Sequence, residues 1–120
     1  MNLLALRGAI TLESNTRDEV AEKTQRLVNE MLARNEIAHD EIVSIIFTAT
    51  DDVTAEFPAT AARAVGLGDV PLLCARELAI DGATPLCVRI LMHFNTTKTR
   101  PELRHVYLEG ARNLRDDLPE

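Results

Sequence analysis

The residues best suited to chemistry lie between Pro71 and Ile90, in the sequence PLLCARELAIDGATPLCVRI. A short apolar run ends at Cys74 and Glu77, and a second apolar run carries Arg89 in its middle. Desolvating an ionised guanidinium inside such a run costs several kcal/mol unless an anion meets it. That anion is either a protein carboxylate such as Glu77 or a ligand, and the pattern alone favours the protein carboxylate.

Four other residues are candidates for binding an anion. Arg7 interrupts an apolar run near the N-terminus as Arg89 does in its own run. Tyr107 is the only tyrosine, and such a residue is more often a half-buried ring with its hydroxyl in water than a ligand contact. By pattern, Arg63 and Arg115 are ordinary surface arginines.

Familiar catalytic motifs are missing from the sequence. It has no glycine-rich phosphate loop and no Ser/His/Asp or Cys/His set. Cys74 and Cys87 lack metal-binding spacing and the three histidines are scattered, so we expect no metal and no cofactor. Cys74 is more often a small core residue than a nucleophile. Several arginines with one glutamate and one tyrosine suit a site that binds a small dianion and acts electrostatically.

The composition indicates a single domain. The chain of 120 residues is long enough for one core but too short for two, so we expect one domain over residues 1–120 with a flexible tail at 116–120. Only 3% of the residues are aromatic, so the core must be aliphatic, and association with copies of the chain would add stability. The net charge of −6 argues against nucleic acid and anionic membranes as partners, because both require basic patches.

The sequence also predicts a cytoplasmic protein. No stretch approaches the ~20 apolar residues of a membrane span, and the first ten residues lack a basic n-region and a cleavage site. Two cysteines without scaffold spacing are expected to stay reduced.

Strand-like and helix-like segments alternate along the chain. Thr16 and Glu19 fit a capping box that opens a helix, and apolar residues from Val20 onward recur at helical spacing. The β-branched run at residues 42–50 is typical of a strand covered on both faces. The predicted strands cover residues 3–11, 42–50, 70–75 and 87–95 and a brief segment around Tyr107, and a short second helix starts at Pro58. We therefore expect an α+β (mixed α/β) fold with a mixed sheet.

Four motifs in order give the chain a resemblance to a known family. LRGAIT, FTATDDVTAEFPATAAR, PLLCARE followed by VRIL, and RHVYLEGARNLRDDL are similar to segments of the monofunctional chorismate mutases of the trimeric α/β class. The resemblance spans nearly the whole chain. It implies a mixed sheet packed with helices, three subunits that join into a pseudo-α/β barrel, and active sites between neighbouring subunits.

The resemblance also implies an activity, the Claisen rearrangement of chorismate to prephenate in phenylalanine and tyrosine biosynthesis, without cofactor or metal. Arg89 matches the cation that faces the ether oxygen, and Glu77 matches the acid that accepts a hydrogen bond from the ring hydroxyl. Arg7 and Tyr107 match residues that bind substrate carboxylate, and Cys74 matches a thiol that lines the pocket near Glu77.

The resemblance assigns further residues to the edges of the site. Phe57 and Arg63 match a wall and a cation contributed by the neighbouring subunit, and Arg115 matches a tail arginine that helps to close the site. Thr60 and Leu73 stand where some members carry a lysine and a threonine, so both would lie beside the pocket and alter affinity.

Two other functions remain open at this point. The chain could be a non-catalytic trimeric module that binds a small carboxylate, or a member of the reactive-intermediate deaminase family, which shares this general fold. Such proteins need an arginine for a carboxylate, but they do not need Cys74, Glu77, Arg89 and Tyr107 together.

Overall fold

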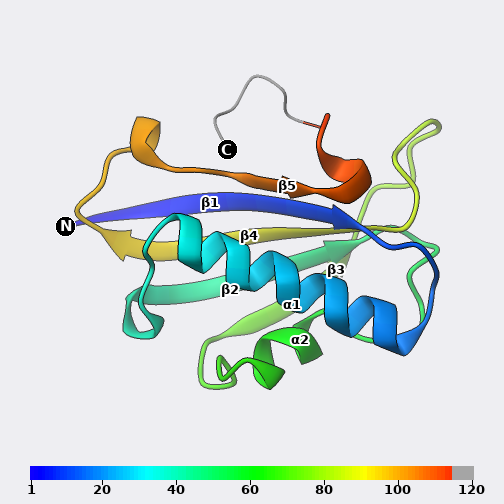
Figure 1. The fold of residues 1–120 in the computed structure, drawn as a ribbon, viewed down its shortest axis with the longest axis horizontal. Helices are drawn as coiled ribbons and strands as arrows, with labels where there is room; N and C mark the ends of the chain where they lie inside the picture. The colour runs from blue at the N-terminus through cyan, green and yellow to red at the C-terminus, as the bar shows by residue number, and fades with distance from the viewer. Residues whose placement is uncertain (115–120) are drawn as a thin grey trace.

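The computed structural model describes residues 1–114. Its sheet contains β1 (Asn2–Thr11), β2 (Ile42–Ala49), β3 (Leu72–Arg76), β4 (Cys87–Thr96) and β5 (Val106–Leu108), and its helices are α1 (Arg17–Arg34) and α2 (Ala59–Ala64) (Figure 1). Single 3-10 turns occur at His39–Glu41, Arg100–Glu102 and Glu109–Ala111. The predicted strands are all present, and the short helix α2 follows directly after Pro58. Neither described helix is long and apolar enough to cross a membrane.

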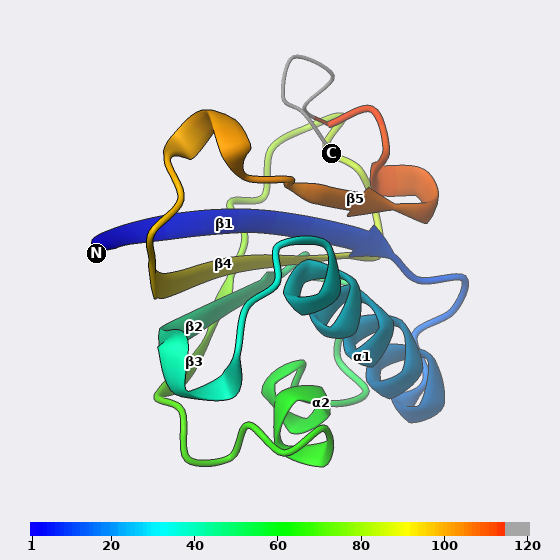
Figure 2. The same cartoon turned by 60° about the vertical axis from the view of Figure 1, so that its left-hand side comes forward.

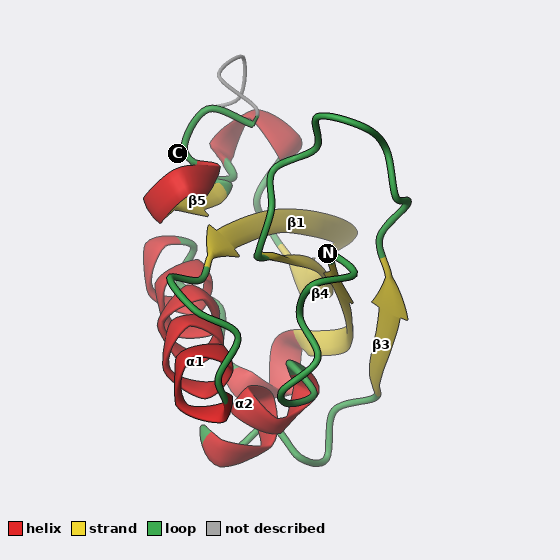
Figure 3. Ribbon diagram, turned by 90° about the vertical axis from the view of Figure 1, so that its right-hand side faces the viewer, coloured by secondary structure: helices red, strands yellow, loops and turns green. Residues whose placement is uncertain are grey.

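The five strands form one mixed sheet in the order β3-β2-β4-β1-β5. The two edge pairs, β2–β3 and β1–β5, are parallel, while β4 runs antiparallel to both β1 and β2. Both helices lie on one side of this sheet (Figures 2 and 3). The predicted α+β class with a mixed sheet is confirmed, and the sheet has one face covered by helices and an opposite face, called the open face below.

Helix α1 packs its predicted apolar stripe against β1. Its buried residues are Val20, Thr24, Leu27, Val28 and Met31. Gly8 of β1 permits this close approach, because a Cβ there would lie 2.5 Å from Met31 Sδ. The Thr16 hydroxyl caps the helix by accepting from the Glu19 N–H at 3.2 Å, but the Glu19 carboxylate accepts from the Glu13 N–H instead of closing the predicted box.

Strand β4 lies at the centre of the sheet and alternates as predicted. Val88, Ile90, Met92 and Phe94 are buried under the helices, and Arg89 is on the open face with the other odd-numbered residues. Burying these apolar side chains is the main favourable contribution to the fold. It also fixes the register of β4, because a slip by one residue would exchange its two faces.

Strand β2 differs from its prediction. Ile45 and Phe47 are fully buried on the helix side, but Ile46 and Thr48 on the open face are only partly buried within one chain. Leu3 and Leu73, each 60% exposed, lie on the same face. The continuous apolar run predicts cover on both sides, and a single chain provides it on one side only.

The segment between β3 and β4 is tied to the end of β2 by Asp52. Its carboxylate accepts the Leu86 N–H at 3.0 and 3.1 Å and the Thr50 hydroxyl at 2.6 Å. Leu86 has φ = +48°, a left-handed conformation that needs such support in a non-glycine residue. The Thr50 and Leu86 hydrogen bonds lower the pKa of Asp52 from its ordinary value of 3.8.

We expect Asp52→Asn to lower the free energy of unfolding at neutral pH by roughly 1 kcal/mol, since charge-assisted hydrogen bonds are lost. A carboxyl with a lowered folded-state pKa contributes stability that is complete above about pH 4 and is lost as the pH falls through the folded pKa. The difference between wild type and variant should therefore shrink below about pH 4. Urea unfolding at several pH values measures it. Asp81→Asn, in the same segment but without a hydrogen bond or ion pair to any described residue, is the control.

Candidate active site

The strand register aligns five residues in one row across the sheet. Tyr107 of β5 is beside Ala9 of β1, Ala9 beside Arg89 of β4, Arg89 beside Thr48 of β2, and Thr48 beside Ala75 of β3. Residues paired directly across strands share a face. The row therefore places the tyrosine, the arginine and the threonine on the open face, although they are far apart in sequence.

A second row, two residues along each strand, adds a further cation. Leu73, Ile46, Leu91 and Arg7 are aligned on β3, β2, β4 and β1. The two rows border a pocket of about 250 Å³ on the open face. Its lining includes Arg7, Ile46, Thr48, Arg89, Leu91 and Tyr107. Two guanidinium groups over an aliphatic floor suit a small ligand that carries negative charge on an apolar frame.

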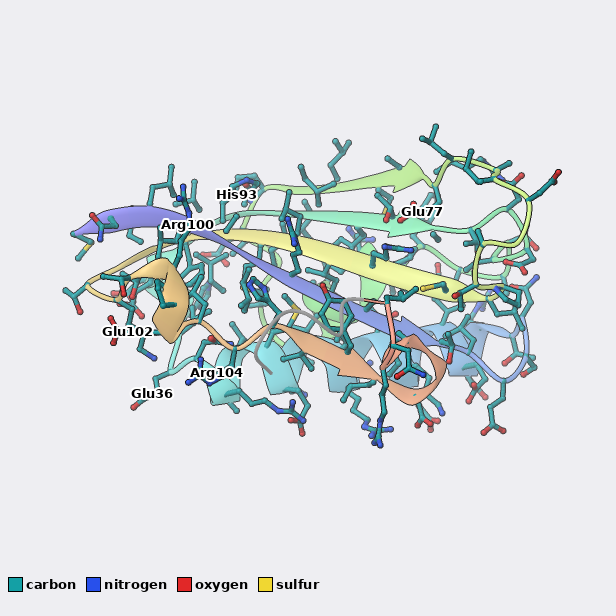
Figure 4. All side chains as sticks on the ribbon, turned by 90° about the horizontal axis from the view of Figure 1, so that it is seen from above. Glu36, Glu77, His93, Arg100, Glu102 and Arg104 are labelled. Carbon is teal, nitrogen blue, oxygen red and sulfur yellow. The ribbon has the colours of Figure 1, made fainter. Side chains whose placement is uncertain are left out.

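Glu77 lies just past the end of β3, beside β2 (Figure 4). Its backbone N–H donates to the Ala49 carbonyl oxygen at 2.9 Å, which extends the β2–β3 pairing by one residue. The Glu77 Oε1 atom accepts a hydrogen bond from the Thr48 hydroxyl and lies 3.2 Å from Arg89 Nε. Among the described residues, the other carboxylate oxygen, Oε2, has no hydrogen-bond partner. Thr48 of β2 and Arg89 of β4 thus both contact one carboxylate oxygen of Glu77.

Arg89 and Glu77 form the ion pair that the sequence pattern favoured. The pair is not a buried one, because the Arg89 side chain is 42% exposed and that of Glu77 is 23% exposed. Arg89 Nε is itself inaccessible and makes no aligned hydrogen bond within residues 1–114. Most of the guanidinium's hydrogen-bonding capacity is thus left for another partner.

Arg7 is fixed through its backbone by a residue that the sequence did not single out. The Arg7 N–H donates to Nδ1 of His105 at 2.9 Å. The β1–β5 ladder begins one residue later, with Gly8 aligned to Val106, so the imidazole continues the pairing by one hydrogen bond. Tyr107 is only 4% exposed, more buried than the half-buried ring expected.

Cys87 belongs to a small buried cluster with Ala9, Tyr107 and Ala111. Burial raises the pKa of the Cys87 thiol above its ordinary value of 9.0, and the nearby Arg89 only partly offsets this effect. The thiol is therefore protonated and packs as an apolar group. No group of three or more His, Cys, Asp or Glu among residues 1–114 is placed to hold a metal ion.

Two candidates lie on the helix side of the sheet instead. Cys74 is aligned with Phe47 and packs against the main core. Together with Phe57, which is 67% exposed, Cys74 lines a different pocket of about 440 Å³. The single chain therefore does not bring Cys74 and Phe57 to the pocket of Arg89.

The remaining candidates are also not gathered there. Arg63 is exposed on α2, where its Nη2 donates to the Thr60 hydroxyl at 3.2 Å. Leu73 is on the open face in the same row as Arg7, but it does not line the pocket. Arg115 and the predicted tail at 116–120 lie outside the described residues.

Comparisons with known proteins agree with one another. A family model described as chorismate mutase type I matches residues 3–118. A chorismate mutase AroH of Thermus thermophilus is 44% identical over 114 residues, covering 94% of this chain and 93% of the relative. One of Bacillus subtilis (strain 168) is 35% identical over 119 residues, covering 98% and 94%. The solved structure of a chorismate mutase from Clostridium thermocellum superposes with a TM-score of 0.89 at 45% identity, covering 91% of this chain and 97% of that one.

The exposure of the Arg89–Glu77 pair predicts how much it contributes to stability. Arg89→Met should lower the free energy of unfolding by no more than about 1 kcal/mol, because exposed pairs contribute little and Thr48 still bonds Glu77. A loss of about 3–5 kcal/mol would instead indicate a structural buried pair. Urea unfolding measures the difference, and Arg76→Met, which removes the exposed pair of Arg76 and Asp51, is the matched control.

Proposed function

The chain belongs to the type I chorismate mutase family and converts chorismate to prephenate, and we propose that it does so by electrostatic catalysis in the open-face pocket. The observation that carries this proposal is the half-exposed Arg89 beside Glu77, with Arg7 and Tyr107 lining the same small pocket. This isomerase activity belongs to the biosynthesis of phenylalanine and tyrosine. The proposed location is the cytoplasm, as the sequence predicted.

The rearrangement places a specific demand on the site. An ether C–O bond breaks while a C–C bond forms, no proton is transferred, and negative charge develops on the ether oxygen. Arg89 faces that oxygen and stabilises the transition state more than the ground state. The guanidinium N–H groups that have no partner among the described residues supply the donors, and the pairing of β4 with β1 and β2 fixes the backbone of Arg89.

Other residues bind and shape the substrate. Glu77 accepts a hydrogen bond from the ring hydroxyl through the oxygen that lacks a partner among the described residues. Arg7 and Tyr107 bind a substrate carboxylate, for which the guanidinium fork is well suited. Held at both ends, the flexible enolpyruvyl ether is restricted to the compact conformer that the reaction requires.

The active unit is a homotrimer with each site shared by two subunits. Support comes from the exposed apolar residues Leu3 and Leu73 on the open face and from the incomplete cover of β2. A neighbouring chain would cover this face and bring its own Phe57 and Arg63 to the pocket. Arg115 would close the site, with Cys74, Thr60 and Leu73 at its edge.

Arg89 variants test the central assignment. The purified chain should consume chorismate without added metal or cofactor. The loss of chorismate's diene absorbance measures this reaction. Arg89→Ala should lower kcat on the order of 10²-fold or more, as expected for removing one preorganised charge. Arg89→Lys keeps the charge but moves it and removes the planar fork, so it should also be impaired.

Arg76→Ala is the control for this experiment, because its side chain points to Asp51 outside the pocket. A near-normal kcat in either Arg89 variant would contradict the role of Arg89. A folded wild-type chain that binds carboxylates without consuming chorismate would favour the non-catalytic or deaminase-like alternatives.

Mixing variants tests whether the site is shared between subunits. Arg89→Ala and Arg63→Ala should each be nearly inactive as pure trimers. If both chains are unfolded, combined in equal amounts and refolded, about one quarter of the sites contain an intact Arg89 facing an intact Arg63. Activity should then recover to about a quarter of the wild-type value, measured by the same absorbance.

The control mixture combines Arg89→Ala with Glu77→Ala. These residues belong to one subunit's side of the site, so no subunit in the mixture supplies both and no recovery is expected. Recovery in the control, or its absence in the first mixture, would contradict the shared site.

A further inference from the structure

We propose that Thr48 is a positioning residue of this enzyme, whose hydroxyl holds the Glu77 carboxylate in place independently of Arg89. This inference rests on the proposed roles of Glu77 and Arg89. It concerns a residue that lies within the motif FTATDDVTAEFPATAAR but to which the resemblance assigned no role.

Thr48 occupies the position that connects the two charged residues. On one side it is aligned with Arg89 of β4, and on the other with Ala75 of β3, two residues before Glu77. Its Oγ1 donates to Glu77 Oε1, the same oxygen that lies 3.2 Å from Arg89 Nε. The next residue, Ala49, accepts the backbone N–H of Glu77 at 2.9 Å. Two consecutive residues of β2 thus fix both the backbone and the carboxylate of Glu77.

This arrangement makes the orientation of Glu77 independent of the movement of Arg89. If Arg89 alone oriented Glu77, turning the guanidinium toward the substrate would release the carboxylate at the same moment. With Thr48 bonded to Oε1, Glu77 keeps its orientation and Oε2 stays available for the ring hydroxyl. A group oriented before the substrate arrives needs no reorganisation during the reaction, which is where electrostatic catalysis gains its advantage.

A merely structural role predicts something different. Thr48 is partly exposed, so its hydroxyl could bond to water, and threonine suits a strand through its β-branched shape alone. Valine keeps that shape and removes the hydroxyl. Under a structural role Thr48→Val would leave catalysis unchanged, whereas positioning requires the donor itself.

The experiment compares kcat and KM for chorismate in Thr48→Val, Thr48→Ser and wild type. We expect Thr48→Val to lower kcat on the order of 10-fold, as for loss of a hydrogen bond to a charged group, with a smaller change in KM. Thr48→Ser restores the donor and should return most of the activity. Ser44→Ala removes a hydroxyl from the same face of the same strand, outside the pocket, and should leave activity unchanged.

A double-mutant cycle shows whether the effect passes through Glu77. In the Glu77→Ala background, Thr48→Val should cause little further loss of kcat, because there is no carboxylate left to hold. Thermal unfolding confirms that each variant is folded. If Thr48→Val does not fold, Thr48→Ala carries the same test, since it also lacks the donor.

Three outcomes would overturn the inference: a kcat near wild type in Thr48→Val, no rescue by Thr48→Ser, or an equal loss with and without Glu77. In those cases Arg89→Ala would still be impaired and the proposed function would stand. A wild-type chain without mutase activity would overturn the proposed function and this inference with it.

Discussion

An ionised guanidinium on the central strand is the constraint on which the site depends. Arg89 is flanked along β4 by buried apolar residues that fix its position. Its partner on the neighbouring strand β1 is the small residue Ala9. A shift of the strand therefore cannot move the guanidinium away from the open face, where its side chain is 42% exposed. It must be met on the open face, and the sheet supplies one carboxylate there, Glu77, at the end of β3. One carboxylate oxygen is not enough for five N–H donors, which leaves the guanidinium partly unpaired in the described part of the chain.

Much of the fold could be predicted from local patterns. The alternation in β4, the helix stripe of α1 and the strand segments all follow from the periodicity of apolar residues, and the structure agrees. The half-formed capping box at Thr16 shows the limit of such rules, because Glu19 has a competing backbone donor in Glu13. The sequence predicted that both faces of β2 are covered, but a single chain covers only one of them. Hydrophobicity tells which residues avoid water but not which chain covers them.

The site was harder to predict because its geometry comes from register. The pairing of Glu77 with Arg89 could be suggested from sequence, but nothing local shows that Glu77 continues the β2–β3 ladder. Thr48 is an ordinary strand threonine until β4 aligns it with Arg89, and His105 is an ordinary histidine until β5 places it beside Arg7. Such residues are recognised by neighbours that are 29 to 98 positions away in the chain.

The partial exposure of the Arg89–Glu77 pair reconciles its two interpretations. A pair that is also meant to receive a ligand must be opened when the ligand binds, and the free energy of opening it is subtracted from the binding energy. Breaking a fully buried pair costs about 3–5 kcal/mol, which would weaken binding by a factor of roughly 150 to 4,000. A half-exposed pair costs about 1 kcal/mol or less. The same contact can thus stabilise the empty site and yield to a substrate that offers Arg89 a better partner, provided that Glu77 has a second anchor on the sheet.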